Sequence, residues 1–232
     1  MILAAGRGER MRPLTDTCPK PLLKVAGVPL IEHHIRKLVA AGLDNIVINI
    51  AWLGEQISDY LKDGKQFGAC IEYSNERSEP LNTAGGIMKA LPLLVESSNE
   101  PFLVVNGDVY CDYNFSSLPT LSESQLAHIY LVNNPSHNKV GDFYLLGDHV
   151  ANSQPNSAHT SAKRLTFSGI GLYCANFFYA EHLKGISPLA PLLRDAAQQN
   201  QLTGSLLKGE WVDVGTPERL VQLNNDLKKD LL

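Results

Sequence analysis

Residues 1–12 read Met-Ile-Leu-Ala-Ala-Gly-Arg-Gly-Glu-Arg-Met-Arg, so a short apolar strand leads directly into a glycine-spaced basic loop. Gly6 and Gly8 lack the Cβ atoms that would keep a backbone away from an anion, which leaves N–H groups able to contact phosphoryl oxygens. Arg7 and Arg10 add charge-assisted donors. Taken alone, the loop fits a phosphate site and an ordinary turn equally well, because short glycine motifs are common.

The hydrophobic pattern alternates between helices and strands throughout the first half of the chain. Apolar residues at helical spacing predict helices, and short apolar runs predict buried strands. The predicted helices cover about 30–41, 54–62 and 83–91, the last ended by Pro92, and the strands cover about 45–50, 69–73 and 102–106. This alternation indicates an α/β fold, Rossmann-like, with a mixed but mainly parallel sheet flanked by helices.

After about residue 126 the pattern changes to shorter, partly alternating strands. These are predicted at 127–132, 143–146 and 165–173, with helices at about 189–199 and 217–227. Such strands indicate antiparallel additions to the sheet. The polar stretch 152–162 has no periodicity and predicts a mobile surface loop. We interpret residues 1–232 as one domain with two halves that divide near residue 125.

Composition narrows the class of function. The chain has 232 residues, a formal net charge of −4 and 44% hydrophobic residues, which is typical of a globular enzyme. A negative chain has no general attraction to nucleic acids, so the basic loop indicates a local pocket for a small phosphorylated ligand. No apolar run approaches the roughly 20 residues that span a bilayer, and no signal pattern is present. We expect a cytoplasmic monomer without nucleic-acid or membrane partners.

Two aspartates follow predicted strands that lie far apart in the sequence. Asp108 comes after the strong strand 102–106, where open α/β sheets place their ligands. Asp213 precedes a glycine and a proline-started helix. The two could hold one Mg²⁺ against a polyphosphate, although each alone could be a turn residue. Asp112 fits a helix cap or a surface charge, and we leave it outside the site.

Lys20 is the third candidate for the site. It lies between Pro19 and Pro21, whose fixed φ angles stiffen the backbone on both sides. Most lysines are solvated surface residues, but a restrained ammonium group near a phosphate loop favours a functional role.

Five segments resemble, in order, the motifs of the sugar-1-phosphate nucleotidyltransferases. They are Leu3-Ala-Ala-Gly-Arg-Gly-Glu-Arg-Met-Arg-Pro-Leu-Thr15, Pro19-Lys-Pro-Leu22, Leu81-Asn-Thr-Ala-Gly-Gly86, Asn106-Gly-Asp108 and Trp211-Val-Asp-Val-Gly-Thr216. Together they reach from one end of the chain nearly to the other. Five ordered matches are far more specific than any one of them.

The resemblance implies the nucleotide-diphospho-sugar transferase fold and a Mg²⁺-assisted reaction. A sugar 1-phosphate attacks the α-phosphate of a nucleoside triphosphate, and pyrophosphate leaves. Because the attacking oxygen is already an anion, the protein has to align and neutralise two anions instead of supplying a general base. The implied catalytic residues are Arg10, Lys20 and Asp108, and the implied metal ligands are Asp108 and Asp213. The implied nucleotide-binding residues are Leu3, Ala4, Ala5, Gly6, Arg7, Gly8, Lys20, Asn82, Gly85 and Asn106.

Within the family, some segments are most similar to the N-acetylmuramate-1-phosphate uridylyltransferases. These are Gly86-Ile-Met-Lys-Ala-Leu-Pro-Leu-Leu94, Gly141-Asp-Phe143 and Thr166-Phe-Ser-Gly-Ile170. Those enzymes make UDP-N-acetylmuramate from UTP in peptidoglycan recycling. The resemblance therefore implies UTP and a sugar 1-phosphate as partners, with the nucleotide in the first half and the sugar in the second. It implies sugar contacts from Asp142 and Gly169, and charge suggests Lys163 or Arg164 for the lactyl carboxylate.

Departures from the family pattern leave alternatives open. Asn82 stands where many relatives have glycine, and 162–166 replaces the sugar loop typical of glucose-1-phosphate thymidylyltransferases. A mannose- or glucose-1-phosphate nucleotidyltransferase is therefore one alternative. A non-catalytic nucleotide-sensing subunit is another, although it would be expected to lack one of the catalytic or metal residues. We expect a short first strand and no appended β-helix or acetyltransferase domain.

Overall fold

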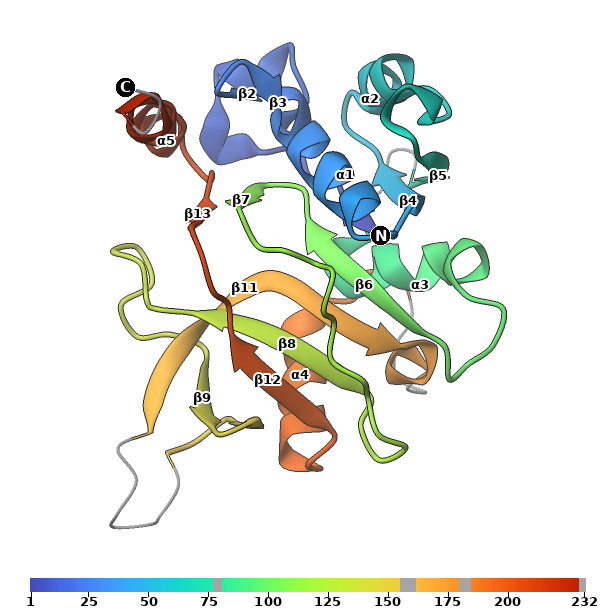
Figure 1. Ribbon diagram of the computed structural model, residues 1–232, viewed down its shortest axis with the longest axis vertical. Coiled ribbons are helices and arrows are strands. Elements are labelled where there is room, and N and C mark those ends of the chain that lie inside the picture. Colours follow the sequence, from blue (N-terminus) through green and yellow to red (C-terminus); the bar gives the residue numbers. More distant parts are fainter. Residues whose placement is uncertain (77–80, 155–161, 180–184, 230–232) are drawn as a thin grey trace.

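The computed structural model describes residues 1–76, 81–154, 162–179 and 185–229, and it contains a nine-stranded sheet with helices packed on it (Figure 1). The helices are α1 (Leu30–Ala40), α2 (Gly54–Leu61), α3 (Asn82–Leu94), α4 (Leu189–Gln198) and α5 (Pro217–Lys229). In spatial order, the strands of the sheet are β5 (Cys70–Asn75), β4 (Asn45–Ile50), β1 (Ile2–Leu3), β6 (Pro101–Asn106), β11 (Lys163–Cys174), β8 (Ala127–Val132), β12 (Leu202–Leu206), β10 (His149–Ala151) and β9 (Phe143–Leu146). Two small sheets pair β2 (Lys24–Val25) with β3 (Val28–Pro29) and β7 (Val109–Cys111) with β13 (Trp211–Asp213).

The sheet corrects the prediction of a mainly parallel arrangement. Only its first half is as expected, since β5, β4, β1 and β6 pair in parallel. β11 runs antiparallel to β6, β8 and β9, and β10 runs antiparallel to β9 and β12, whereas β8 and β12 are parallel. Because β9 pairs with both β10 and β11, the second half closes into a small barrel. The tight turn Gly147-Asp148 between β9 and β10 enforces antiparallel pairing there.

Two apolar clusters cover the two faces of the sheet. Ile35 of α1 and Ile57 of α2 are fully buried in one of them, and Ile87 of α3 and Leu193 of α4 are buried in the other. Apolar side chains at helical spacing therefore face the sheet from both sides, as the sequence pattern predicts. None of the described helices combines the length and apolar content needed to cross a membrane.

The ends of two helices test the local predictions. Gly42 follows α1 with a φ of 79°, and the N–H of Leu43 donates to Leu38 O at 2.9 Å, which is a glycine-capped helix end as expected. Pro92 does not end α3, which continues to Leu94. A proline in the last turn removes one helical N–H without disturbing the turns before it, and Leu94 still packs against the core.

The sequence pattern missed β12 and β10. β12 includes Gly204, which weakens a strand pattern, but a Cβ there would lie 2.7 Å from Val150 Cγ2. Glycine at this position lets β10 and β12 pack closely in the barrel. Most of the predicted mobile loop at 152–162 falls outside the described residues.

A third, smaller cluster joins the end of the chain to its beginning. Met11 from the basic loop, Val25 of β2 and Leu220 of α5 are buried together. Asn224 of α5 accepts a hydrogen bond from Ala26 N at 2.8 Å and donates to Lys24 O at 3.1 Å. The carboxyl-terminal helix is therefore held beside the amino-terminal loop, which brings Asp213 near it.

We expect His34 to make the stability of the fold depend on pH. Its Nε2–H donates to Val109 O at 2.7 Å, and burial lowers the pKa of His34 from 6.5 to about 4. As the pH falls, the imidazole of His34 gains a proton near pH 6.5 in the unfolded chain but only near pH 4 in the folded protein. The stabilisation that comes from neutral His34 is therefore complete above pH 6.5 and is lost as pH falls toward 4. We expect a loss of about 3 kcal/mol of unfolding free energy over this range from this group.

The measurement is urea unfolding at several pH values for the wild type and His34→Gln. The difference in unfolding free energy between them should shrink as pH falls from 7 to 4, since glutamine has no proton to gain. A difference that stays constant over this range would show that His34 is not the responsible group.

Candidate active site

A cleft of about 410 Å³ opens where β1 and β6 end. Ten residues that the sequence assigns to the nucleotide or to catalysis line it, namely Leu3, Ala4, Ala5, Gly6, Gly8, Arg10, Lys20, Asn82, Asn106 and Asp108. They come from segments that are up to a hundred residues apart, and parallel strands bring their ends to one edge. The structure therefore collects most of the predicted nucleotide residues in one cavity.

The two glycines of the basic loop serve the cleft differently. A Cβ on Gly6 would have no atom within 4 Å, so the backbone there faces open space that a ligand can occupy. Gly8 has a φ of 67°, and a Cβ on it would lie 3.2 Å from Lys20 Cβ and from Thr15 Cγ2. The hydroxyl of Thr15 also donates to Gly8 O at 2.8 Å. Gly8 therefore makes the turn and lets the stem of Lys20 pass beneath it.

Arg7 and Arg10 of the loop have separate positions. Arg10 lines the cleft, in a short 3₁₀ turn (Glu9–Met11). Arg7 instead holds its guanidinium 4.3 Å from the ring centroid of Trp52, in a cation–π contact. The indole N–H of Trp52 donates to Thr15 O at 3.0 Å, which fixes the ring. The Arg7 side chain therefore packs on Trp52, and Arg7 is not among the residues that line the described cleft.

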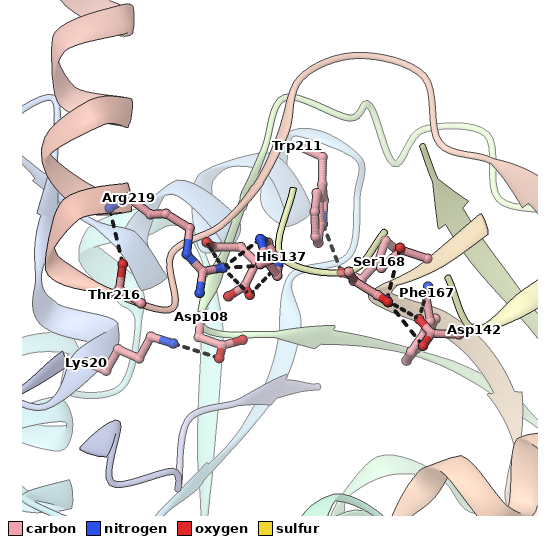
Figure 2. A network of polar contacts seen from close by, with 12 residues as sticks. Lys20, Asp108, His137, Asp142, Phe167, Ser168, Trp211, Thr216 and Arg219 are labelled. Carbon is pink, nitrogen blue, oxygen red and sulfur yellow. Dashed lines mark hydrogen bonds and ion pairs between the residues drawn. The ribbon is translucent and has the colours of Figure 1, made fainter. Parts of the chain in front are cut away.

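Lys20 and Asp108 form an ion pair at the edge of the cleft, with 2.8 Å between Lys20 Nζ and Asp108 Oδ2 (Figure 2). The Lys20 side chain is 7% exposed, whereas that of Asp108 is 39% exposed. A buried ammonium group needs a counter-ion, and Asp108 supplies it while keeping access to the cleft. The pair links two residues that the sequence singled out separately.

Asp213 lies on the strand next to Asp108. β13 pairs with β7 so that Asp213 is opposite Val109, and Val214 N donates to Asp108 O at 3.0 Å. Mg²⁺ accepts a small number of protein carboxylates and completes its shell with water and phosphate oxygens, so this pair suits it. Among the described residues, no group of three or more His, Cys, Asp and Glu side chains could hold a metal. Phosphate oxygens of a bound nucleotide would have to supply further ligands.

The segment that begins α3 meets the other side of the cleft. Asn82 has a φ of 58°, a left-handed conformation that asparagine and glycine tolerate better than other residues. This backbone conformation accommodates asparagine as well as glycine, the residue that the sequence resemblance leads us to expect here. Gly85 packs tightly, since a Cβ on it would lie 2.3 Å from Gly185 O, and its N–H donates to Ser187 O at 3.1 Å. Gly85 does not line the described cleft.

The predicted sugar residues are spread over the second half of the chain. A Cβ on Gly169, whose φ is 79°, would lie 2.6 Å from Asn106 Nδ2, so this glycine contacts the edge of the cleft. Asp142 accepts a hydrogen bond from Phe167 N at 2.8 Å, which ties its loop to β11. Lys163 donates to Asn133 Oδ1 at 2.8 Å. Lys163 precedes Ile170, where the pairing of β11 with β6 begins, by seven residues, or roughly 20 Å along the strand. It is therefore distant from the end of β6 at which the cleft opens.

Sequence reasoning missed two buried polar residues of the cleft, Asn49 and Glu76. Asn49 Oδ1 accepts from Ala4 N at 2.8 Å, and its Nδ2 donates to Glu76 Oε1 at 2.6 Å. The other oxygen of Glu76 accepts from Leu81 N at 3.2 Å. Glu76 thereby connects the segment that leads into the glycine-spaced loop, through Asn49, to the segment that starts α3. The signal available in the sequence was that Asn49 is a polar residue near the end of the predicted strand 45–50 and that Glu76 follows the predicted strand 69–73.

Comparisons with known proteins agree with this geometry. The model of the family described as "Nucleotidyl transferase" matches residues 1–140. An N-acetylmuramate alpha-1-phosphate uridylyltransferase from Neisseria meningitidis serogroup B is 51% identical over 224 residues, which cover 95% of this chain and 94% of that protein. A mannose-1-phosphate guanyltransferase from Gibberella zeae is 32% identical, and the match covers 94% of this chain but 61% of that protein.

Solved structures agree on the fold. A putative glucose-1-phosphate thymidylyltransferase from Bacillus anthracis superposes with a TM-score of 0.78 at 22% identity, covering 97% of this chain and 92% of that one. A UDP-glucose pyrophosphorylase superposes with a TM-score of 0.74 at 19% identity, covering 99% of this chain and 97% of that one. These structures share the mixed α/β architecture. The family match, the relatives and the lining of the cleft together establish that this chain belongs to the nucleotidyl transferase family.

Proposed function

We propose that this protein is a uridylyltransferase that joins N-acetylmuramate 1-phosphate to UTP and releases pyrophosphate. The observation that carries the proposal is the Lys20–Asp108 pair, 2.8 Å apart, beside the glycine-spaced loop in the cleft. The base and the sugar are inferred from the relative that is 51% identical over 95% of the chain. The product is UDP-N-acetylmuramate, made for peptidoglycan recycling in the cytoplasm.

The cleft suits an in-line transfer between two anions. The backbone of residues 5–8 and the guanidinium of Arg10 would hold the leaving pyrophosphate, since Ala5, Gly6, Gly8 and Arg10 line the cavity. Lys20 would neutralise the α-phosphate or the incoming sugar phosphate. The attacking phosphate oxygen needs no general base, so these residues act by alignment and charge neutralisation.

Asp108 and Asp213 are the residues that would hold Mg²⁺. Asp213 lies on β13 opposite Val109, the residue after Asp108, and the carboxylate of Asp108 is open to the cleft. When bound, the ion would offset negative charge on the triphosphate. The scarcity of protein ligands supports an ion shared with the nucleotide.

Substrate recognition would divide between the two halves of the chain. Residues 1–125 would hold UTP, with Asn82, Gly85 and Asn106 near the base and ribose. Residues 126–232 would hold the sugar, with Gly169 against its ring and Asp142 near its hydroxyl groups. The contact of Gly169 with Asn106 supports a junction between the two substrates at this point.

The proposed reaction is tested by a panel of substrates. The protein is incubated with Mg²⁺, UTP or GTP, and the 1-phosphates of N-acetylmuramate, N-acetylglucosamine, glucose and mannose, while pyrophosphate release is measured. We expect kcat/KM for N-acetylmuramate 1-phosphate with UTP to exceed the others by about 100-fold, because a site that binds the lactyl group loses those contacts with smaller sugars.

The same panel separates the alternatives. Turnover with mannose 1-phosphate and GTP, but not with the muramate substrate, would support the function named for the 32% identical relative instead. Binding of UTP without turnover of any sugar would support a nucleotide-sensing subunit. Either result would reject the proposed function.

A further inference from the structure

Asp213 is held by a cation of its own, separate from the Lys20–Asp108 pair. Arg219 Nη1 lies 2.6 Å from Asp213 Oδ2 and 3.0 Å from the backbone oxygen of the same residue. A single nitrogen thus fixes both the carboxylate and the peptide from which it extends. The Asp213 side chain is 19% exposed and that of Arg219 is 22% exposed, so solvent weakens the pair only partly.

The turn between the two residues leaves little space for any other arrangement. A Cβ on Gly215 would lie 2.7 Å from Arg219 Nη2 and 2.9 Å from Asp213 Oδ1. Arg219 is in the first turn of α5, where its N–H donates to Thr216 Oγ1 at 3.4 Å. Glycine at 215 and the start of the helix together direct the guanidinium back onto the strand that carries Asp213.

A residue from a second segment, His137, contacts both members of the Arg219–Asp213 pair. His137 has its two ring nitrogens 3.1 and 3.3 Å from Arg219 Nη1, and its Nε2 is 3.2 Å from Asp213 Oδ2 (Figure 2). His137 lies in the connection between β8 and β9 that also carries Asp142. The proposed sugar side of the protein therefore touches the Arg219–Asp213 pair directly.

We propose that Arg219 is a positioning residue for Asp213, an inference that rests on the proposed function. Asp108 lies in the turn before β7, and Asp213 lies on β13, which pairs with β7. With both carboxylates bound to a divalent cation beside the triphosphate, three sources of negative charge would meet there. Lys20 balances Asp108, and Arg219 balances Asp213. By fixing one orientation of the Asp213 carboxylate, Arg219 keeps it ready to bind a divalent cation together with the nucleotide.

The test measures Mn²⁺ binding to the complex of the protein with UTP by electron paramagnetic resonance, which requires no sugar. Arg219→Gln should weaken Mn²⁺ binding and lower kcat, each by about 10-fold, the effect of one lost charge-assisted hydrogen bond. Arg219→Lys should recover part of both losses because it restores the charge. Lys229→Gln removes a positive charge from an exposed position on the same helix and should change neither.

A double-mutant cycle identifies the route of the effect. In the Asp213→Asn background, Arg219→Gln should change Mn²⁺ affinity less than about twofold, because the partner through which it acts is gone. Full additivity of the two changes would overturn the proposal. So would an Arg219→Gln protein that loses thermal stability but binds Mn²⁺ as well as the wild type does.

This experiment and the substrate panel can fail independently. If no sugar 1-phosphate reacts with the wild type, the proposed function fails, yet the Mn²⁺ titrations with UTP still decide the role of Arg219. If the panel succeeds and the cycle is additive, only the role of Arg219 is rejected.

Discussion

Replacing Asp108 with asparagine is expected to lower kcat by at least about 1,000-fold in Mg²⁺, because a metal ligand supports several kcal/mol of charge stabilisation in the transition state. Asparagine has the same shape and can still accept a hydrogen bond from Lys20 Nζ, which lies 2.8 Å from Asp108 Oδ2. The fold should therefore persist, with a lower melting temperature because the buried ammonium group of Lys20 loses its counter-ion. Pyrophosphate release under saturating substrates measures the loss, and circular dichroism with thermal unfolding checks the fold.

Asp112→Asn is the matched control. Asp112 lies four residues further along and accepts a hydrogen bond from Glu210 N at 2.6 Å, which an asparagine oxygen can also accept. This variant should keep kcat within about twofold, as expected for a substitution outside the site that preserves its contact. Equal losses in the two variants, or full activity of Asp108→Asn, would reject the metal assignment.

Lys20→Met is expected to lower kcat by about 100- to 1,000-fold, the usual effect of removing one donor that stabilises developing charge in a closed site. The substitution removes the cation proposed for the phosphates and leaves Asp108 without its counter-ion. Methionine fits the space of the lysine stem, which is buried beneath Gly8. Steady-state kinetics with UTP should show the effect mainly in kcat, since the interaction strengthens in the transition state.

Lys65→Met provides the comparison for Lys20. Lys65 also pairs with an aspartate, Asp63, but its side chain is 86% exposed and outside the lining of the cleft. The activity of the Lys65→Met variant should match that of the wild type, because an exposed ion pair contributes little to the stability of the fold. A Lys20→Met protein that retained more than half of the wild-type kcat would show that the ammonium group does not act on the phosphates.

Local sequence was sufficient for the parts of this protein that depend on neighbouring residues. The repeat of apolar side chains identified α1 and α2, and glycine at position 42 identified the end of α1. The spacing of glycines in residues 4–8 and the prolines around Lys20 pointed to residues that line the cleft. Each signal lies within one turn or strand, where periodicity and backbone preference act directly.

The residues that sequence reasoning missed depend on contacts between distant segments. Asn49 is a strand residue in sequence, and only the register of β4 beside β1 brings its amide to Ala4 N. Glu76 is 27 residues away from its partner Asn49. Arg219 resembles a surface arginine on a helix until the turn at Gly215 directs it onto Asp213. No local preference encodes these pairings.

The sequence by itself determined which chemical groups are present and in which order, and hence the family and the candidate phosphate-binding loop. Only the tertiary structure decided that Lys20 pairs with Asp108, that Arg219 holds Asp213, and that the second half closes into a barrel. The physical reason is that helices and turns form from contacts within a few residues. Strand pairing and ion pairs instead depend on how distant segments pack, which a linear pattern of residue types does not specify.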